Sequence, residues 1–414
     1  MRWVKPPLFL PMLAFEEALA RMLAEVPAPE GESVSLRAAS GRILADQIRS
    51  PIDLPVFDNS AMDGYAVRAA DVTSAKPASP ARLRLAGKVA AGEIFMGEVT
   101  PGTCVRLFTG SPLPAGADAV VMQEDTHIDP TAPGEVVILA PAGPGENVRT
   151  RGEDVKQGTI LAEAGAAITP GRIGLLAAAG FGRLRVGRQP VVGLLATGSE
   201  LTEPGQPLAP GQIYECNRTA LAALMERVGA VPKTLPLVAD VLAGTTQALA
   251  DAFNQCDAVV TSGGVSVGEM DFLKLAFEQI GGRLEFWKVA MKPGRPFVFG
   301  RCQGKLLFGL PGNPVSALVT FRLLVRPALL RWQGATDVSL PAHPGVLAEP
   351  LLNPGERRHF MSVKVDSTGK IQLAGVQASH VLSSLAAANG LVDVPAHTTL
   401  AAGSAVTVLR WDCY

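Results

Sequence analysis

Two glycine-rich turns, each directly after a short apolar run, are the residues of this chain best suited to bind an anion. Residues 261–268 (TSGGVSVG) follow the run 257–260, and residues 310–314 (LPGNP) follow the run 305–308. Glycine lets the backbone approach a ligand closely, and the helical pattern that follows each turn provides N–H groups that favour negative charge. The turns therefore predict a site for phosphate or another oxyanion. Its candidate binding residues are Gly263, Gly264, Ser266, Pro311, Gly312 and Pro314.

Three carboxylates follow predicted strands of the same sheet. They are Glu200, Asp240 and Asp271, after the strands predicted at 191–196, 235–238 and 258–261. Ligands of open α/β sheets bind beyond the carboxyl ends of the strands, and carboxylate oxygens at a phosphate-binding edge are typical of Mg²⁺ sites. Each acid alone is better explained as a helix cap or a solvated loop residue. Their coincidence at one edge favours a metal site.

A basic segment, residues 287–296, supplies the opposite charge through Lys288, Lys292 and Arg295. In an extended segment, alternation places Lys288 and Lys292 on one face. Two prolines and a glycine stiffen the end of the segment. A rigid basic loop beside carboxylates suits an anionic substrate. The alternative is an ordinary solvated loop.

The region 188–332 alternates between strand and helix patterns, which predicts βαβ units and a parallel, doubly wound sheet. The predicted strands are 191–196, 235–238, 258–261 and 306–310, and the predicted helices are 218–228, 245–253, 272–280 and 315–330.

The rest of the chain predicts three further parts. Residues 50–154 carry short alternating runs separated by proline and glycine turns, which indicates a β-rich domain. Helices predicted at 14–26 and 168–180 are expected to pack together, so that the β-rich domain is an insertion in a discontinuous linking domain formed by 12–49 and 155–187. Residues 333–414 predict a small C-terminal β domain. The fold class is multidomain α/β plus β.

Composition excludes several classes of protein. The net charge of −1 over 414 residues argues against non-specific nucleic-acid binding. Five scattered cysteines without a CxxC pair suit a reducing compartment and give no zinc signature. Since no apolar run is long enough to span a bilayer, we expect a cytoplasmic protein without membrane or nucleic-acid partners.

Further motifs indicate a resemblance to a known protein family. They are residues 58–67 (DNSAMDGYAV), Thr109-Gly110 with 114–118 (PAGAD), and 151–154 (RGED), besides the two glycine turns. With these motifs the chain resembles, over nearly its whole length, the molybdopterin molybdotransferases, which are the MoeA proteins and the E-domain of gephyrin. The resemblance implies a MogA-like α/β domain, a small helical/β linking domain and a C-terminal β-barrel-like domain.

The resemblance also implies an activity. Molybdate is inserted into adenylyl-molybdopterin with Mg²⁺ as cofactor, AMP is released, and molybdenum cofactor is the product. The family's active site lies between the subunits of a homodimer. Transient contacts with the molybdopterin adenylyltransferase and with apo-molybdoenzymes are expected as well.

Residue roles follow by matching the motifs. The implied catalytic residues are Asp63, Thr109, Asp154, Glu200, Asp240 and Asp271, the last three also as metal ligands. The implied substrate-binding residues are Arg149, Lys288, Lys292, Pro311, Pro314, Arg357 and Ser379. Arg358 and Ser383 compete with the last two for the same roles. Ser199 stands where many relatives have an acid.

Alternatives remain at this point. The pairs Asp63-Gly64 and Glu153-Asp154 are also explained as ordinary turn residues without a catalytic role. The α/β domain alone suits a molybdopterin adenylyltransferase, and a gephyrin-like scaffold without enzymatic activity is the third interpretation.

Overall fold

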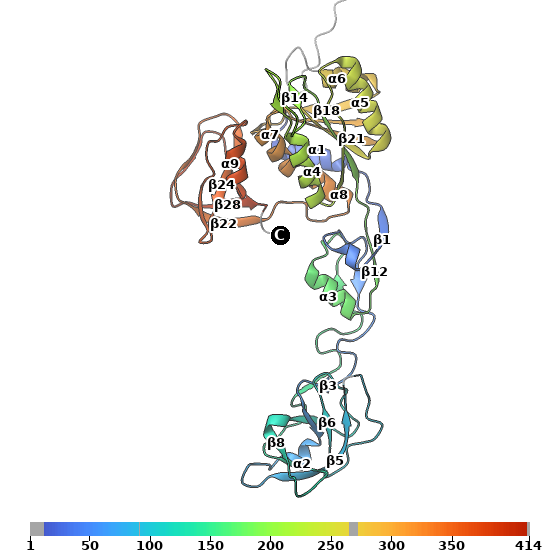
Figure 1. Ribbon diagram of the computed structural model, residues 1–414. Helices are drawn as coiled ribbons and strands as arrows, with labels where there is room; N and C mark the ends of the chain where they lie inside the picture. The colour runs from blue at the N-terminus through green and yellow to red at the C-terminus, as the bar shows by residue number, and fades with distance from the viewer. Residues whose placement is uncertain (1–11, 91, 265–271, 412–414) are drawn as a thin grey trace, which may run out of the picture.

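The computed structural model describes residues 12–90, 92–264 and 272–411. Figure 1 shows an elongated molecule in which an α/β unit and a C-terminal β domain lie together at one end. An arm containing α3 (Pro170–Ala178) leads from them to a separate β module at the other end.

The α/β unit is built on a six-stranded sheet with the order β16-β13-β17-β21-β20-β18. Strand β20 runs antiparallel to its two neighbours, and the other neighbouring pairs are parallel. The strands are β13 (Val191–Ala196), β16 (Val231–Thr234), β17 (Ala258–Ser262), β18 (Arg283–Trp287), β20 (Val298–Cys302) and β21 (Lys305–Leu310). The helices are α1 (Phe15–Ala24), α4 (Asn217–Arg227), α5 (Leu242–Gln255), α6 (Phe272–Gln279), α7 (Pro314–Thr320) and α8 (Arg326–Trp332).

Alternate residues of the central strands face two different apolar clusters. Leu194 and Val260 belong to one cluster, together with residues of α1, α4, α7 and α8. Leu195 and Val259 belong to the other cluster, together with residues of α5 and α6. Parallel strands covered on both faces must be apolar, which is why the sequence revealed them. The prediction of a wholly parallel sheet is wrong at β20, which is antiparallel to both of its neighbours.

Two predicted elements differ from the structure. The strand predicted at 235–238 is wrong, because the strand is β16, Val231–Thr234. The regular pairing of β16 with β13 does not continue through Pro236, because proline has no N–H to donate. Beyond it, Val238 forms an isolated β-bridge with Thr197. The helix predicted at 315–330 is divided by a π turn at Phe321–Val325, which precedes Pro327. A proline inside a helix removes one backbone donor, and a π turn accommodates that loss.

The arm consists of strands that run out to the β module and back. Strand β1 (Gly31–Ser35) pairs with β12 (Arg183–Gly187), and β2 (Ile48–Arg49) pairs with β11 (Ile160–Ala162). The module is therefore inserted through a two-stranded connection. The predicted contact between the helices 14–26 and 168–180 is wrong: α1 packs on α8, whereas α3 packs on β11 in the arm.

The β module contains a six-stranded sheet of order β7-β4-β6-β5-β9-β8. Its elements are β3 (Asn59–Ser60), β4 (Gly64–Val67), α2 (Ala69–Val72), β5 (Ala81–Val89), β6 (Thr103–Leu107), β7 (Ala119–Met122), β8 (Thr126–Ile128), β9 (Glu135–Ile138) and β10 (Val148–Arg149). Strand β10 pairs with β3 beside the sheet, at the end where the arm enters.

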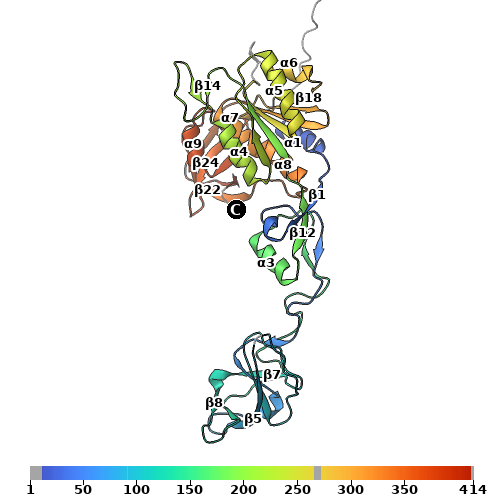
Figure 2. The same cartoon turned by 45° about the vertical axis from the view of Figure 1, so that its right-hand side comes forward.

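The C-terminal domain is a five-stranded barrel. Its strands follow the order β24-β25-β22-β28-β26, and pairing between β24 and β26 closes the ring. Figure 2 shows this domain directly beside α4 and α7 of the α/β unit. Strand β19 (Met291–Lys292), from the basic segment, adds in parallel to β24 and joins the two domains. The remaining elements are β22 (Ala342–Leu347), β23 (Leu351–Asn353), β24 (Arg358–Val365), β25 (Lys370–Leu373), α9 (Leu382–Ala387), β26 (Gly390–Val394), β27 (Thr398–Leu400) and β28 (Ala405–Arg410).

None of the helices in the described residues has the length and apolar character that crossing a membrane requires.

Asp257 fixes the point where the arm joins the sheet. Its carboxylate accepts hydrogen bonds from Arg188 Nη1 (2.8 Å) and Nη2 (3.1 Å) and from Val191 N (2.7 Å). Burial raises the pKa of Asp257, but these bonds outweigh burial and hold the pKa below its usual value. The folded state therefore gains stability from the ionised carboxylate above the unfolded pKa. That stability is lost as the pH falls through the lowered pKa of the folded state.

We expect Asp257→Asn to lower the free energy of unfolding by about 1–3 kcal/mol at neutral pH. The difference from the wild type should shrink as the pH falls below about 4. Urea unfolding at several pH values measures this, with Asp251→Asn on the exposed side of α5 as the control. A difference that stays constant down to low pH contradicts the electrostatic explanation.

Candidate functional site

The two glycine turns touch each other at the carboxyl ends of β17 and β21. Gly263 and Gly264 have positive φ angles of 88° and 67°, which favour glycine. A Cβ atom on Gly263 would lie 2.8 Å from the carbonyl oxygen of Thr197, and one on Gly312 would lie 3.6 Å from Gly263 Cα. Gly263 N donates to Leu310 O (3.2 Å). The described residues of the two turns thus form one continuous backbone surface.

Asn217, the first residue of α4, joins the two turns. Its Nδ2 donates to Ser262 Oγ and to Gly312 O, both at 2.7 Å, and the residue is 7% exposed. The sequence prediction missed Asn217. One feature of the sequence could have revealed it: Asn217 is a polar residue at the start of a predicted helix, and that helix belongs to the same predicted α/β region as both turns.

A buried ion pair holds Asn217 in place. Glu215 Oε1 accepts hydrogen bonds from Asn217 N (2.6 Å) and Arg218 N (2.9 Å), while its Oε2 pairs with Arg218 Nε (3.0 Å). The side chains of Glu215 and Arg218 are only 3% and 2% exposed. Because the carboxylate binds the first N–H groups of the helix as well as the guanidinium, it fixes the start of α4.

The predicted acidic edge is described in part. Glu200 follows β13, and Asp240 N donates to Ser199 Oγ (3.3 Å) in the same region. Burial raises the pKa of Asp240, and the negative charge of Glu200 raises it further. The structure therefore brings Glu200 and Asp240 together, whereas Asp271 and Ser266 lie outside the described residues. Within the described ranges, no group of three potential metal ligands occurs.

A cavity of about 470 Å³ lies between the α/β unit and the barrel, beside the second glycine turn. Three cations and two histidines line it, and no carboxylate is among the described residues that do so. It contains the predicted residues Lys292, Arg295, Pro311, Arg357 and Ser379, together with His359 and His380, which the prediction missed. Such a lining suits an anion with more than one charge.

The basic segment reaches this cavity by an unexpected path. Lys288 has a positive φ of 84°, so the segment is not extended there and the predicted common face of Lys288 and Lys292 is wrong. At this turn of the backbone, Lys288 N donates a hydrogen bond to Phe297 O (2.9 Å). Lys288 is not among the residues that line the cavity. Gly294, with φ of 101°, packs so tightly that a Cβ atom would overlap Thr320 Cγ2.

Strand alternation separates Arg357 from Arg358. Arg357 lines the cavity and its Nη1 donates to Met291 O (3.1 Å). Burial and nearby Arg295 lower the pKa of Arg357. Arg358 points to the other side of the strand, where it pairs with Asp393 and Glu16. Of the two arginines, Arg357 is therefore the one placed for a ligand.

Ser379 ties the barrel to the second turn. Asn313 Nδ2 donates to Ser379 Oγ (3.1 Å), and Val315 N donates to Ser379 O (3.2 Å). Ser383 is exposed and is not among the lining residues. Pro314 begins α7 directly after Asn313, so the start of this helix faces the cavity.

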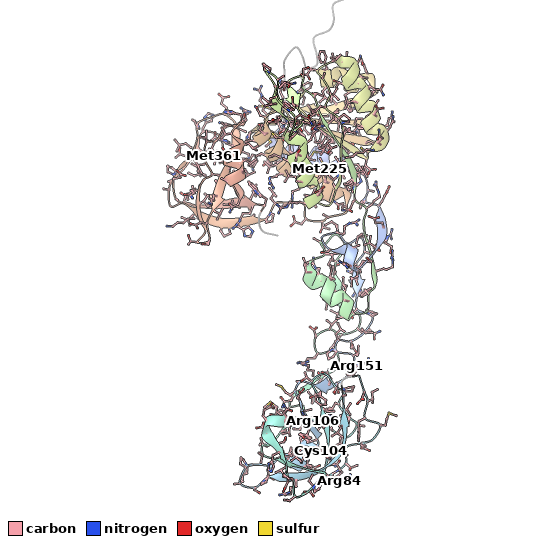
Figure 3. The ribbon with its side chains drawn as sticks, in the orientation of Figure 1. Arg84, Cys104, Arg106, Arg151, Met225 and Met361 are labelled. Atoms are coloured by element: carbon pink, nitrogen blue, oxygen red, sulfur yellow. The ribbon has the colours of Figure 1, made fainter. Side chains whose placement is uncertain are left out.

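The residues predicted in the β module form a second group. Asp63 Oδ1 accepts hydrogen bonds from Thr109 N and Thr109 Oγ1, both at 2.8 Å, and these bonds lower its pKa. Arg149 is exposed on β10, and Asp154 is exposed with its N–H bonded to Leu54 O (3.0 Å). Figure 3 shows Arg106 and Arg151 on this module and Met361 of β24 at the other end of the molecule. Within one chain the two groups are therefore far apart.

Comparison with known proteins decides the family. Residues 13–180 match the profile "MoeA N-terminal region (domain I and II)", residues 193–331 match "Probable molybdopterin binding domain", and residues 344–411 match "MoeA C-terminal region (domain IV)". A molybdopterin molybdenumtransferase of Haemophilus influenzae is 40% identical over 96% of this chain and 98% of its own length. This chain belongs to the MoeA family of molybdopterin molybdenumtransferases.

Other MoeA relatives agree. Molybdopterin molybdenumtransferase 2 of Mycobacterium tuberculosis is 41% identical over 92% of this chain and 94% of its own length. A solved MoeA structure from Pyrococcus horikoshii superposes with a TM-score of 0.81 at 34% identity, covering 97% of this chain and 99% of that one. Membership of the MoeA family confirms the predicted fold class, including the barrel. It also confirms the prediction that the protein is a transferase of molybdenum cofactor biosynthesis.

Proposed function

We propose that this enzyme inserts molybdate into adenylyl-molybdopterin and releases AMP. The main support is the meeting of a cationic cavity and an acidic edge at the same pair of glycine turns. Molybdate is an oxyanion and the substrate carries phosphate groups, so both need donors and positive charge. We place the protein in the cytoplasm, where it exchanges intermediates with the molybdopterin adenylyltransferase and with apo-molybdoenzymes.

The cavity residues bind the oxyanion in this proposal. Lys292 and Arg295 supply charge from the basic segment, Arg357 supplies charge from the chain before β24, and Ser379 supplies a hydroxyl. The backbone N–H groups of the two glycine turns hold phosphate beside it. Because the cations come from both the α/β unit and the barrel, their spacing depends on the packing of the two domains.

Glu200 and Asp240, with Asp271, would hold Mg²⁺. Carboxylate oxygens are the ligands this ion prefers. The raised pKa of Asp240 beside Glu200 fits the assignment, since two close carboxylates repel each other until a cation lies between them. When bound, Mg²⁺ neutralises charge on the phosphoanhydride that is cleaved.

The defining experiment combines the purified protein, adenylyl-molybdopterin, molybdate and Mg²⁺, and follows AMP release and reconstitution of an apo-molybdoenzyme. We expect both to require molybdate. ATP-dependent adenylylation without molybdate would instead support the adenylyltransferase, and binding without turnover would support the scaffold.

We also propose a homodimer in which Asp63, Thr109, Arg149 and Asp154 complete the site of the partner subunit. These residues belong to the inserted β-rich part of the chain, and Figure 1 shows the β module at the end of the arm, away from the α/β unit and the barrel. Their polar side chains have a role in the reaction only if they face a second copy.

Mixing two inactive variants tests the shared site. Asp63→Asn and Lys292→Ala should each abolish most activity, whereas subunit exchange between them should restore about a quarter of the wild-type rate. The reason is that half the mixed dimers are heterodimers, each with one intact site. The rate of AMP release after exchange measures this. No recovery, with exchange verified by mass spectrometry, would show that each site lies within one chain.

A further inference from the structure

His359 is a cavity residue to which no role has been given so far. It lies on β24, is 5% exposed, and lines the cavity together with Arg357, two positions earlier in the chain. In the parallel pairing of β19 with β24, His359 is opposite Lys292. The histidine is thus placed among the cations that are proposed to bind the oxyanion.

Among the described residues, the charged groups that line the cavity beside His359 are three cations. Lys292 comes from β19, Arg295 from the segment after it, and Arg357 from the chain before β24, while the second histidine, His380, comes from the segment before α9. On β26 the residue opposite His359 is the apolar Val394, and the nearby Asp393 is paired with Arg358. Asn313 and Ser316, from the start of α7, are uncharged.

This environment keeps the imidazole neutral in the absence of an anion. Burial, then the charges of Lys292 and Arg357, lower the pKa of His359 to about 4. An anion in the cavity reverses the balance, because it attracts a positive ring and accepts its hydrogen bond. Neutral histidine has one N–H donor, whereas the imidazolium has two.

We propose that His359 is a further oxyanion-binding residue of this cavity, and that it takes up a proton when a dianion binds. The inference rests on the proposed function of the cavity as the oxyanion site. It adds a cation that exists only in the complex, so the cavity gains its fourth positive charge together with its ligand.

The proposal fixes the sign of the pH dependence. The pKa of His359 is higher in the complex than in the free protein, so binding strengthens as the pH falls between the two values. In that interval the dissociation constant should decrease by up to about tenfold for each pH unit, with up to one proton taken up per site. Lysine and arginine side chains in general are already protonated in this pH range, so an anion bound by such residues alone takes up no proton.

Calorimetric titration of the full-length protein with molybdate, and separately with sulfate, tests the proposal. Titrations between about pH 5 and pH 7, in two buffers of different ionisation enthalpy, give the number of protons bound. We expect proton uptake with both anions, which excludes protonation of molybdate itself as the source. His359→Gln should abolish the uptake and flatten the pH dependence, whereas His380→Gln, at the exposed mouth of the same cavity, should leave the uptake in place.

A measurement on the wild type guards against misfolding of the variant. The chain has five histidines, so the ring signals can be assigned by NMR. The His359 ring should titrate at a higher pH with sulfate than without it. Anion binding without proton uptake, or uptake that disappears in His380→Gln, overturns the role of His359 and leaves the oxyanion site intact. The absence of any anion binding would overturn the oxyanion site together with this inference.

Discussion

Asn217→Asp is expected to lower kcat/KM for molybdate-dependent AMP release by about a hundredfold while the protein remains folded. The exchange keeps the size of the side chain but replaces the Nδ2 donor with an acceptor. The Ser262 hydroxyl adapts by turning its hydrogen, whereas the carbonyl of Gly312 cannot. The second glycine turn then moves away from the first, and the surface proposed to bind phosphate is lost.

Two further variants separate positioning from general destabilisation. Ser262→Ala removes only the adaptable partner and should cost about tenfold or less. Asn389→Asp removes one Nδ2 donor in the same way, the one bonded to Val365 O (2.9 Å) in the barrel, so it should lower the melting temperature without changing kcat/KM. If Asn217→Asp keeps full activity, or if its loss of activity only follows its loss of folded protein, Asn217 has no positioning role.

Gly294→Ala is expected to weaken molybdate binding at least tenfold and to destabilise the fold by about 2–4 kcal/mol. The new methyl group meets Thr320 Cγ2, and the φ of 101° is unfavourable for any residue other than glycine. Since Lys292 and Arg295 flank Gly294, relief of the overlap displaces both cations. Calorimetry with molybdate and thermal unfolding measure the two effects.

A double-mutant cycle with Thr320→Ser divides the effect into its two causes. Serine lacks the obstructing methyl group but keeps the hydroxyl that donates to Ser316 O (2.7 Å). The pair Gly294→Ala and Thr320→Ser should therefore recover the part of the loss due to overlap, while the cost of the backbone conformation remains. Equal losses with and without Thr320→Ser would show that packing against α7 does not hold the basic segment.

The sequence was informative wherever structure depends on local patterns. Strands β13, β17 and β21 are buried on both faces, so their apolar runs are visible without knowledge of their neighbours. Strand β16 is at the edge of the sheet and is largely exposed, so no apolar run marks it, and the prediction moved to 235–238. The prediction that Lys288 shares a face with Lys292 was wrong because alternation assumes an extended backbone, and the backbone turns at Lys288.

The parts of the site that escaped prediction depend on contacts between distant segments. Asn217 matters because Ser262 and Gly312 lie within reach of one amide, 45 and 95 residues further along the chain. His359 matters because the barrel is paired with β19. Neither residue belongs to a motif with a recognisable spacing, whereas the glycine turns do.

The connection to the β module has a consequence for how such a protein can change over evolutionary time. Ser50 N donates to Thr159 O (2.9 Å), and Gly158 N donates to Ser50 O (2.8 Å), so the chain leaves the arm and re-enters it at one point. An insertion whose ends meet can be lengthened, shortened or exchanged without breaking the core of its host. The module and the rest of the chain can thus diverge as separate inheritable units.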